Sequence, residues 1–263
     1  MDWETVGACN FCGHTSVRLY MKAKIANWYA NRPLRLVECR ACNLVYVSPR
    51  PVFPYPGPQS DEVEGQIAFE RKSARKNVAE THRRHLMNAI ERLGTPARSL
   101  FDMGCGAGTL MTVAQEAGLE VAGNEINPYS VRKLTAEGFK IYASRNCELK
   151  VDRTFDIVIN FDCLEHSYEP FDDLQMCHKL LNDGGILHLK TLFLNSYHHR
   201  EEGAGWRLFG KGHFHFFTPD VLLSMIRKAG FQIEHVETSN LIFVTARKRN
   251  AAIIEEDPSK SVA

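Results

Sequence analysis

The sequence has 263 residues, of which 44% are hydrophobic and 24% are charged, and its 32 Lys and Arg nearly balance its 31 Asp and Glu. A chain of this length can bury a core without disulfides, and balanced charge argues against a protein that binds polyanions with its whole surface. No apolar run approaches the roughly 18–20 residues of a membrane span, and no apolar segment typical of a signal peptide follows the acidic N-terminus. These features predict a cytoplasmic protein with no membrane partner, and nothing in them indicates an oligomeric state.

Four of the eight cysteines form two close pairs, Cys9-Asn-Phe-Cys12 and Cys39-Arg-Ala-Cys42. In a cytosolic chain such pairs favour a metal site over disulfides. Four thiolates complete a tetrahedral shell for Zn²⁺ and leave no open coordination position, so the metal is expected to be structural. An iron site of the same geometry and unligated thiols are the alternatives. The sequence therefore predicts a zinc-ribbon module over residues 1–50, with strand-like stretches at 16–20 and 35–38.

The segment 51–98 differs in composition from its neighbours. Five prolines and one glycine lie between residues 49 and 58, which no helix can cross. From 61 to 93, apolar residues recur at helical steps. This stretch is also basic, because residues 67–98 contain eight Lys or Arg against three Asp or Glu. We expect a proline-rich linker followed by a helical cap.

Strand and helix patterns alternate from residue 99 onward. The expected strands are 99–103, 120–125, 140–143, 155–160, 186–191, 232–237 and 241–247, and the expected helices are 109–117, 128–137, 170–182 and 219–229. This alternation predicts an α/β fold, a doubly wound and mostly parallel seven-stranded sheet. Only about three residues join the last two strands, which permits a hairpin but not a parallel crossover, so the last strand should be reversed. This domain spans 99–250, and a flexible tail follows over 251–263.

A glycine-rich loop, Gly104-x-Gly106-x-Gly108, stands between the first of these strands and its helix. Glycines allow a close approach of backbone to ligand, and the helix N-terminus offers N–H groups. A dinucleotide loop would place its third glycine three residues after the second, not two. Asp102 would also repel a pyrophosphate, but it would favour an ammonium group. Both details fit S-adenosylmethionine, although an ordinary tight turn beside strand-end acids is the alternative.

Glu125 ends the next strand, where a carboxylate can accept hydrogen bonds from ribose hydroxyls. Together, residues 99–247 resemble the class I S-adenosylmethionine-dependent methyltransferases. Three stretches carry the resemblance: Asp102-Met-Gly-Cys-Gly-Ala-Gly108, Phe155-Asp-Ile-Val-Ile-Asn-Phe-Asp-Cys-Leu-Glu-His166 and Leu181-Asn-Asp-Gly-Gly-Ile-Leu187. Residues 214–218 are similar to a small-molecule subgroup in which some members carry an N-terminal four-cysteine zinc module. The resemblance implies a Rossmann-like fold and a cofactor site at Asp102, Gly104, Cys105, Gly106, Glu125, Ile126, Asn160 and Phe161.

The acceptor side is expected just past the fourth strand, since ligands bind at the carboxyl ends of such strands. The resemblance places an acceptor-side pair at Glu165 and His166, and histidine titrates in the right range for a general base. Structural roles, such as packing on adenine, are the alternative for His166. Within the long connection 192–217, His213 is the expected acceptor contact, and a surface lid packed by its own aromatic residues is the alternative for this segment. His213 and His215 alternate, so both rings could face one way on an extended segment.

The favoured hypothesis is methyl transfer to a small-molecule acceptor, of natural-product or sugar type, with a histidine as general base. A first alternative is an RNA methyltransferase that presents RNA on the zinc ribbon and the basic helices. That class would lose affinity steeply with salt, and the chain lacks the Asn/Asp-Pro-Pro-aromatic motif of exocyclic-amine nucleic-acid methyltransferases. Further alternatives are another displacement at the sulfonium, or cofactor binding without turnover.

Overall fold

The computed structural model describes residues 2–26, 33–52, 66, 69–70 and 77–249. Most of the expected proline-rich linker, the first part of the expected helical cap and the tail from residue 250 lie outside this range. Among the described helices, none is both long and apolar enough to cross a membrane.

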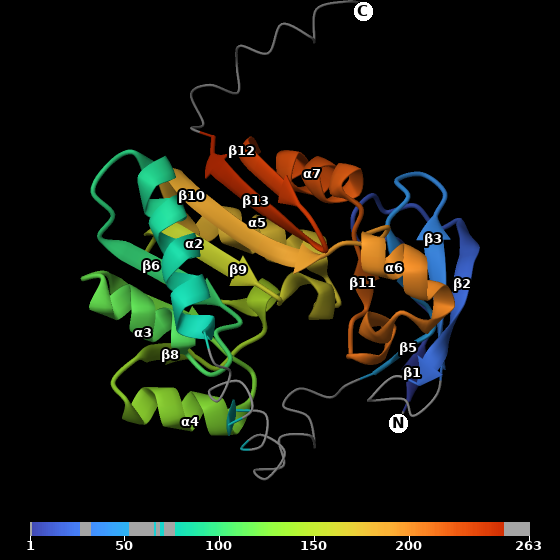
Figure 1. Cartoon of the computed structure of the whole chain (residues 1–263), viewed down its shortest axis with the longest axis horizontal. Coiled ribbons are helices and arrows are strands. Elements are labelled where there is room, and N and C mark those ends of the chain that lie inside the picture. Colours follow the sequence, from blue (N-terminus) through green and yellow to red (C-terminus); the bar gives the residue numbers. More distant parts are fainter. Residues whose placement is uncertain (1, 27–32, 53–65, 67–68, 71–76, 250–263) are drawn as a thin grey trace, which may run out of the picture.

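A seven-stranded sheet forms the centre of the molecule (Figure 1). Its strands are β6 (Ser99–Met103), β7 (Glu120–Asn124), β8 (Lys140–Tyr142), β9 (Phe155–Phe161), β10 (Leu181–Leu192), β12 (Phe231–Thr238) and β13 (Leu241–Lys248), in the order β12-β13-β10-β9-β6-β7-β8. The strand β13 runs antiparallel to both β10 and β12, whereas the other paired strands are parallel. The expected sheet with a reversed last strand is confirmed, and the reversed strand is inserted beside β10.

Helices cover both faces of this sheet. They are α2 (Val78–Leu93), α3 (Thr109–Glu116), α4 (Pro128–Ala136), α5 (Pro170–Leu180) and α7 (Pro219–Lys228). Because strand side chains alternate between faces, Leu100 and Ile157 pack in one core with α2 and α3. Their neighbours Phe101 and Val158 pack in the opposite core with α5 and α7. The carboxyl ends of β6, β7 and β9 are thereby held at one edge.

The helix ends follow local chemistry. The Asn127 side chain accepts hydrogen bonds from the backbone N–H groups of Tyr129 and Ser130, and Pro128 occupies the first position of α4, as is typical of helix starts. The helix α7 begins at Pro219 as expected, but Thr218 makes no side-chain capping bond. Gly230, with φ of 100°, follows the end of α7.

The N-terminal part builds a second, four-stranded sheet. It contains β2 (Val17–Ala26), β3 (Pro33–Cys39), β4 (Val45–Val47) and β11 (His215–Phe216), in the order β11-β4-β3-β2, while β1 (Trp3–Glu4) pairs with β5 (Arg50–Pro51). The strand β11 comes from the C-terminal part of the chain and adds antiparallel to β4. In Figure 1, β2 and β3 lie on the side of the molecule opposite α3 and α4. The two parts of the chain therefore share a sheet.

The long connection between β10 and β11 packs on this N-terminal sheet. It contains α6 (Tyr197–Glu202) and two 3-10 turns, over Gly203–Gly205 and Arg207–Gly210. Trp206 and Phe209 are buried in one cluster with Leu36 of β3 and Val45 of β4. Trp206 and Phe209 are thus part of a core and do not belong to a surface lid, whereas Tyr197 of α6 is exposed.

Candidate functional site

The glycine loop after β6 requires the left-handed backbone region. Gly104, Gly106 and Gly108 have φ values of 72°, 59° and 71°. A residue with a Cβ atom adopts such positive φ values only at a cost in free energy. A Cβ atom on Gly104 would lie 2.5 Å from the Cys163 Sγ, so the loops after β6 and β9 are in close contact. This contact places the two sequence-predicted halves of the site next to each other.

Two side chains from the end of β7 brace the glycine loop. The Gly106 N–H donates to Glu125 Oε2 at 2.8 Å, and the N–H groups of Ile126 and Asn127 donate to Oε1 at 2.7 and 2.8 Å. The Gly104 N–H donates to Asn124 Oδ1 at 3.2 Å. A carboxylate accepts up to about four hydrogen bonds, so Glu125 Oε2 retains the capacity for one more, as from a ribose hydroxyl.

The other residues expected at the cofactor differ in exposure. Asp102 is buried within β6, and Asn160 near the end of β9 is fully buried. Among the described residues, neither polar atom of the Asn160 amide has a nitrogen or oxygen partner, and the Cys177 thiol is the polar group beside it. Ile126, in contrast, exposes 52% of its surface. Cys105 and Phe161 are half-buried. The exposed apolar surface of Ile126 beside Glu125 fits the flat apolar part of a ligand such as a nucleoside.

Three expected acceptor-side residues converge past β9. Glu165 and His166 lie in the 3-10 turn η3 (Leu164–His166), and His213 lies shortly before β11. One ligand-type atom from each of the three side chains lies within 4.8 Å of the other two. The His166 and His213 ring centroids are 4.5 Å apart. Glu165 and His213 are buried, whereas His166 is exposed, so His166 is the member that a ligand can reach.

Backbone carbonyls decide the tautomers of these rings. His166 Nδ1 lies 3.0 Å from the Gly212 carbonyl oxygen, and His213 Nδ1 lies 2.8 Å from the Leu208 carbonyl oxygen. A carbonyl only accepts, so Nδ1 carries the proton in each ring and Nε2 is the basic atom. Burial, together with the charge of His166, lowers the pKa of His213 well below its usual value, which keeps His213 neutral.

The pKa of the Glu165 carboxyl group is raised above that of an exposed glutamic acid. Burial, and to a smaller degree the charge of Asp162, raises its pKa to about 8. The Thr191 hydroxyl donates to Glu165 Oε2 at 2.7 Å and opposes this rise. Thr191 could not be predicted as a site residue, because a single threonine inside a strand carries no distinguishing signal. Two imidazoles and a carboxyl group could also serve as ligands of a divalent cation.

The four paired cysteines form a compact cluster. The Cys9 and Cys42 sulfurs are 3.6 Å apart, and the Cys12 and Cys39 sulfurs are 3.5 Å apart. All four sulfurs lie within 4.8 Å of one another. Four sulfurs at about 2.3 Å from a central Zn²⁺ would be about 3.8 Å apart, so the cluster fits a tetrahedral ion. The two pairs, which have 26 residues between them in the sequence, are thus brought together.

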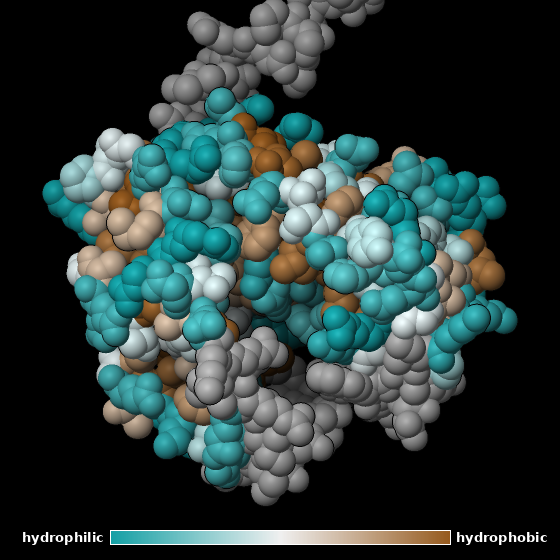
Figure 2. Space-filling view, in the orientation of Figure 1, coloured by the Kyte–Doolittle hydropathy of each residue, from teal (hydrophilic) through white to brown (hydrophobic). Residues whose placement is uncertain are grey.

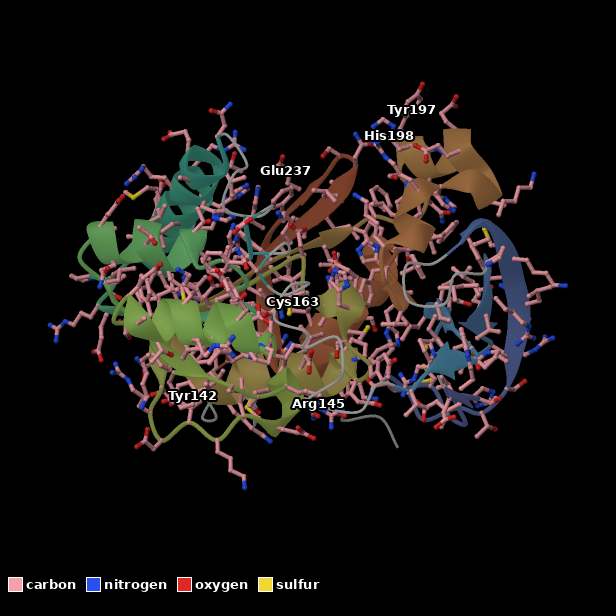
Figure 3. All side chains as sticks on the ribbon, turned by 90° about the horizontal axis from the view of Figure 1, so that it is seen from below. Tyr142, Arg145, Cys163, Tyr197, His198 and Glu237 are labelled. Carbon is pink, nitrogen blue, oxygen red and sulfur yellow. The ribbon has the colours of Figure 1, made fainter. Side chains whose placement is uncertain are left out.

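The remaining histidines of the long connection do not join the acceptor-side group. His215 Nδ1 lies 2.9 Å from the Ser167 carbonyl oxygen, and its ring contacts Tyr46. His213 and His215 therefore have different neighbours, because only His215 lies in a strand. Figure 3 shows His198 and Tyr197 on α6 at the edge of the molecule, away from Cys163 near its centre.

Figure 2 shows that the molecule is hollowed near the centre of one face, between the α2 and α6 sides.

The chain is similar to known proteins both in its sequence and in its fold. A family model described as a methyltransferase domain matches residues 75–236. The ubiquinone biosynthesis O-methyltransferase of Cereibacter sphaeroides is 35% identical over 158 residues, which cover 55% of this chain and 63% of that protein. The protein of the same name from Pseudomonas aeruginosa is 26% identical over 161 residues, which cover 56% and 69% of the two chains.

Solved structures show the same fold. The 1,6-didemethyltoxoflavin-N1-methyltransferase of Burkholderia thailandensis, solved with S-adenosylhomocysteine, has a TM-score of 0.55 at 18% identity, and the match covers 80% of this chain and 98% of that one. The magnesium protoporphyrin IX methyltransferase of Synechocystis PCC 6803, also with bound S-adenosylhomocysteine, has a TM-score of 0.55 at 19% identity over 68% and 87% of the two chains. At these identities the similarity establishes the arrangement of the sheet and helices.

Proposed function

The chain belongs to the class I S-adenosylmethionine-dependent methyltransferases, and we propose that it transfers a methyl group to a small-molecule acceptor with His166 as the general base. Relatives named O-methyltransferases favour oxygen as the acceptor atom. We also propose that Cys9, Cys12, Cys39 and Cys42 hold a structural Zn²⁺.

The cofactor would lie against the glycine loop. Asp102 would face its ammonium group and Glu125 Oε2 would accept from a ribose hydroxyl, while Ile126 would cover the base. The bound cofactor supplies a methyl group on a positively charged sulfur for in-line displacement. The chain's own task is to hold donor and acceptor in line, for which positioning can contribute up to about 7–11 kcal/mol.

The acceptor proton would pass to His166 Nε2. The Gly212 carbonyl holds the Nδ1–H, so the ring presents its basic nitrogen without a change of tautomer. Neutral His213 beside it does not repel the imidazolium that forms. As the acceptor atom bonds to the methyl group, its proton remains on His166 until solvent removes it.

The observation that carries this proposal is the contact between the two loops. Gly104 lies against Cys163, and Cys163 precedes the turn that contains Glu165 and His166 by one residue. This contact supports the proposal, because a cofactor on the glycine loop would lie beside the three converging side chains. Placement of reactant and base within one site is what methyl transfer needs most.

The first prediction concerns His166. We expect His166→Ala to lower turnover by about 10²–10⁴-fold, the usual contribution of a general base, while the affinity for S-adenosylhomocysteine stays within about twofold. Turnover would be followed as S-adenosylhomocysteine release with a panel of phenolic, sugar and amine acceptors, and affinity by titration calorimetry. His198→Ala, at the exposed edge of α6, is the matched control and should retain both properties.

Two results would contradict the proposal. Equal losses of turnover and cofactor affinity in His166→Ala would assign the ring to the cofactor. Failure of the wild-type chain to bind S-adenosylhomocysteine would remove the cofactor assignment itself.

A further inference from the structure

We propose that the four-cysteine cluster sets the relative placement of His166 and His213, and that Asn10 is the positioning residue through which its first half acts. The proposal rests on the proposed function only for assigning these two histidines to the acceptor side. The first cysteine pair is joined to the segment after His166 through the residues between its cysteines, and the second pair is joined to the segment after His213 through β4.

The first pair contacts the segment after His166. Asn10, between Cys9 and Cys12, accepts a hydrogen bond from the Phe171 N–H at 2.7 Å and donates to Glu169 Oε2 at 2.6 Å. Glu169 stands at the N-terminal cap of α5 but makes no capping bond with its own side chain. Asn10 therefore satisfies an N–H group in the first turn of α5 that would otherwise lack an intrahelical partner.

The neighbouring residue strengthens this attachment. The Phe11 ring packs 5.5 Å from the Phe171 ring. Lys228 from α7 donates to the Phe11 carbonyl oxygen at 3.2 Å and lies over both rings. The residues between Cys9 and Cys12 are thus fixed to α5 and α7. The helix α5 begins only four residues after His166. The position of the first turn of α5 therefore restrains the position of the turn that carries His166.

The second pair leads into the segment after His213. Cys39 ends β3, its N–H donates to the Leu44 carbonyl oxygen at 2.9 Å, and β4 begins at the next residue. The Val47 N–H of β4 donates to the Phe214 carbonyl oxygen at 2.9 Å, and the Phe214 N–H donates to the Glu165 carbonyl oxygen at 2.8 Å. Phe214 therefore connects β4 to the turn that carries Glu165 and His166.

A metal ion would couple these two attachments. Cys9 and Cys39 are both buried in the core that also contains Leu174 of α5. When one ion holds all four sulfurs, Asn10 and β4 become parts of one rigid unit. Without the ion, each contact depends on local packing alone. The distance between the His166 and His213 rings should then vary, while the glycine loop, which is braced by Asn124 and Glu125, should not change.

The test uses full-length, zinc-loaded protein with ¹³C-labelled histidine and bound S-adenosylhomocysteine. In Asn10→Ala, the Cε1–H signals of both His166 and His213 should shift, although zinc content stays at one ion per cysteine cluster, since Asn10 is not a ligand. The affinity for S-adenosylhomocysteine should stay within about twofold. Turnover on an accepted substrate should fall by about 10–100-fold through kcat, the usual effect of removing a group that orients a site.

The matched control is Arg18→Ala. It breaks the Arg18–Glu38 ion pair between β2 and β3 within the same module, but touches neither attachment, and should leave both histidine signals unmoved.

Removal and return of zinc in the wild-type chain tests the same proposal without a substitution, and this experiment decides the proposal if Asn10→Ala does not fold. Unmoved His166 and His213 signals upon zinc removal, or in folded Asn10→Ala, would overturn the proposal, as would a parallel loss of cofactor affinity. Absence of cofactor binding in the wild-type chain would instead contradict the proposed function.

Discussion

At the scale of single residues, Gly104 combines two restraints. Its φ of 72° is unfavourable for any residue with a Cβ, by roughly 1–2 kcal/mol, and the Cβ would also overlap the Cys163 sulfur. We expect Gly104→Ala to push the loops after β6 and β9 apart and to weaken S-adenosylhomocysteine binding at least tenfold. Thermal unfolding and titration calorimetry would measure the two effects separately.

Gly118→Ala is the matched control for that substitution. Gly118, which follows α3, has φ of 82°, but no atom lies within 4 Å of its would-be Cβ. It should therefore show the backbone cost alone, as a loss of stability with unchanged cofactor affinity. If both variants bind S-adenosylhomocysteine like the wild-type chain, the close contact between the two loops does not matter for the cofactor.

The sequence was informative about those site residues that belong to local patterns. Asp102, the glycines and Glu125 stand at fixed spacing around a strand, a turn and a helix, so their chemistry could be predicted. Asn124 and Thr191 could not, because their roles arise from hydrogen bonds to Gly104 and Glu165 that depend on neighbouring strands. The roles assigned to His166 and His213 remain predictions until turnover is measured.

At the scale of elements, α2 docks on the sheet through histidines that are neutral when buried. His85 of α2 stacks on Phe243, and its Nδ1 lies 3.4 Å from His188 Nε2. Burial is the main cause that lowers the pKa of His188 to about 3 and that of His82 to about 4. For His82 the nearby Lys190 charge lowers the pKa further, and Asp162 opposes this.

Acid should therefore weaken the docking of α2. A histidine with a lowered folded-state pKa binds a proton more readily in the unfolded chain, so stability falls as pH drops from about 6.5 towards about 4. His82→Phe removes one such group and keeps the ring that contacts Phe161. After allowance for the partial exposure of His82, we expect a gain of about 1 kcal/mol at pH 5, or about 2–4 °C, and almost none at pH 8.

Thermal unfolding at pH 5 and pH 8 would check this expectation. The exposed His198→Ala variant should follow the wild-type curve at both values. If the Tm falls equally between pH 8 and pH 5 in His82→Phe and in the wild-type chain, His82 does not contribute to the pH dependence of stability.

The elements that could be predicted are those with their own periodicity. The strand β6 has the expected bounds, whereas β10 begins at Leu181, five residues earlier than expected, because pairing of Leu181 with Phe155 extends it across an irregular register. The strand β11 was not predicted. Its two residues become a strand only through pairing with β4, and no local pattern can indicate such a contact.

At the scale of the whole molecule, the boundary expected near residue 50 does not separate two cores. The buried residues Cys9, Cys39 and Tyr46 belong to the same cluster as Leu174 and Val221, and β11 completes the N-terminal sheet. Composition alone suggested a separate module, since the cysteine pairs and the prolines mark a change along the chain. Composition cannot show that a distant segment returns to share the sheet.

A shared core has a consequence for unfolding. A cooperative unit loses its structure together when its contacts are continuous, so removal of zinc should destabilise the whole chain. We expect calorimetry to show one transition for the zinc-loaded chain. Chelation should lower the free energy of unfolding by about 4 kcal/mol relative to protein at a free zinc concentration a thousand times the Kd. The Tm of the whole transition should fall by roughly 8–16 °C. Cys42→Ser should reproduce the shift, whereas Cys147→Ser, outside the cluster, should respond to chelator like the wild-type chain. Two transitions, of which only the smaller responds to chelator, would mean that the N-terminal sheet unfolds independently despite its contacts. The zinc site would then stabilise only the part of the chain that contains it.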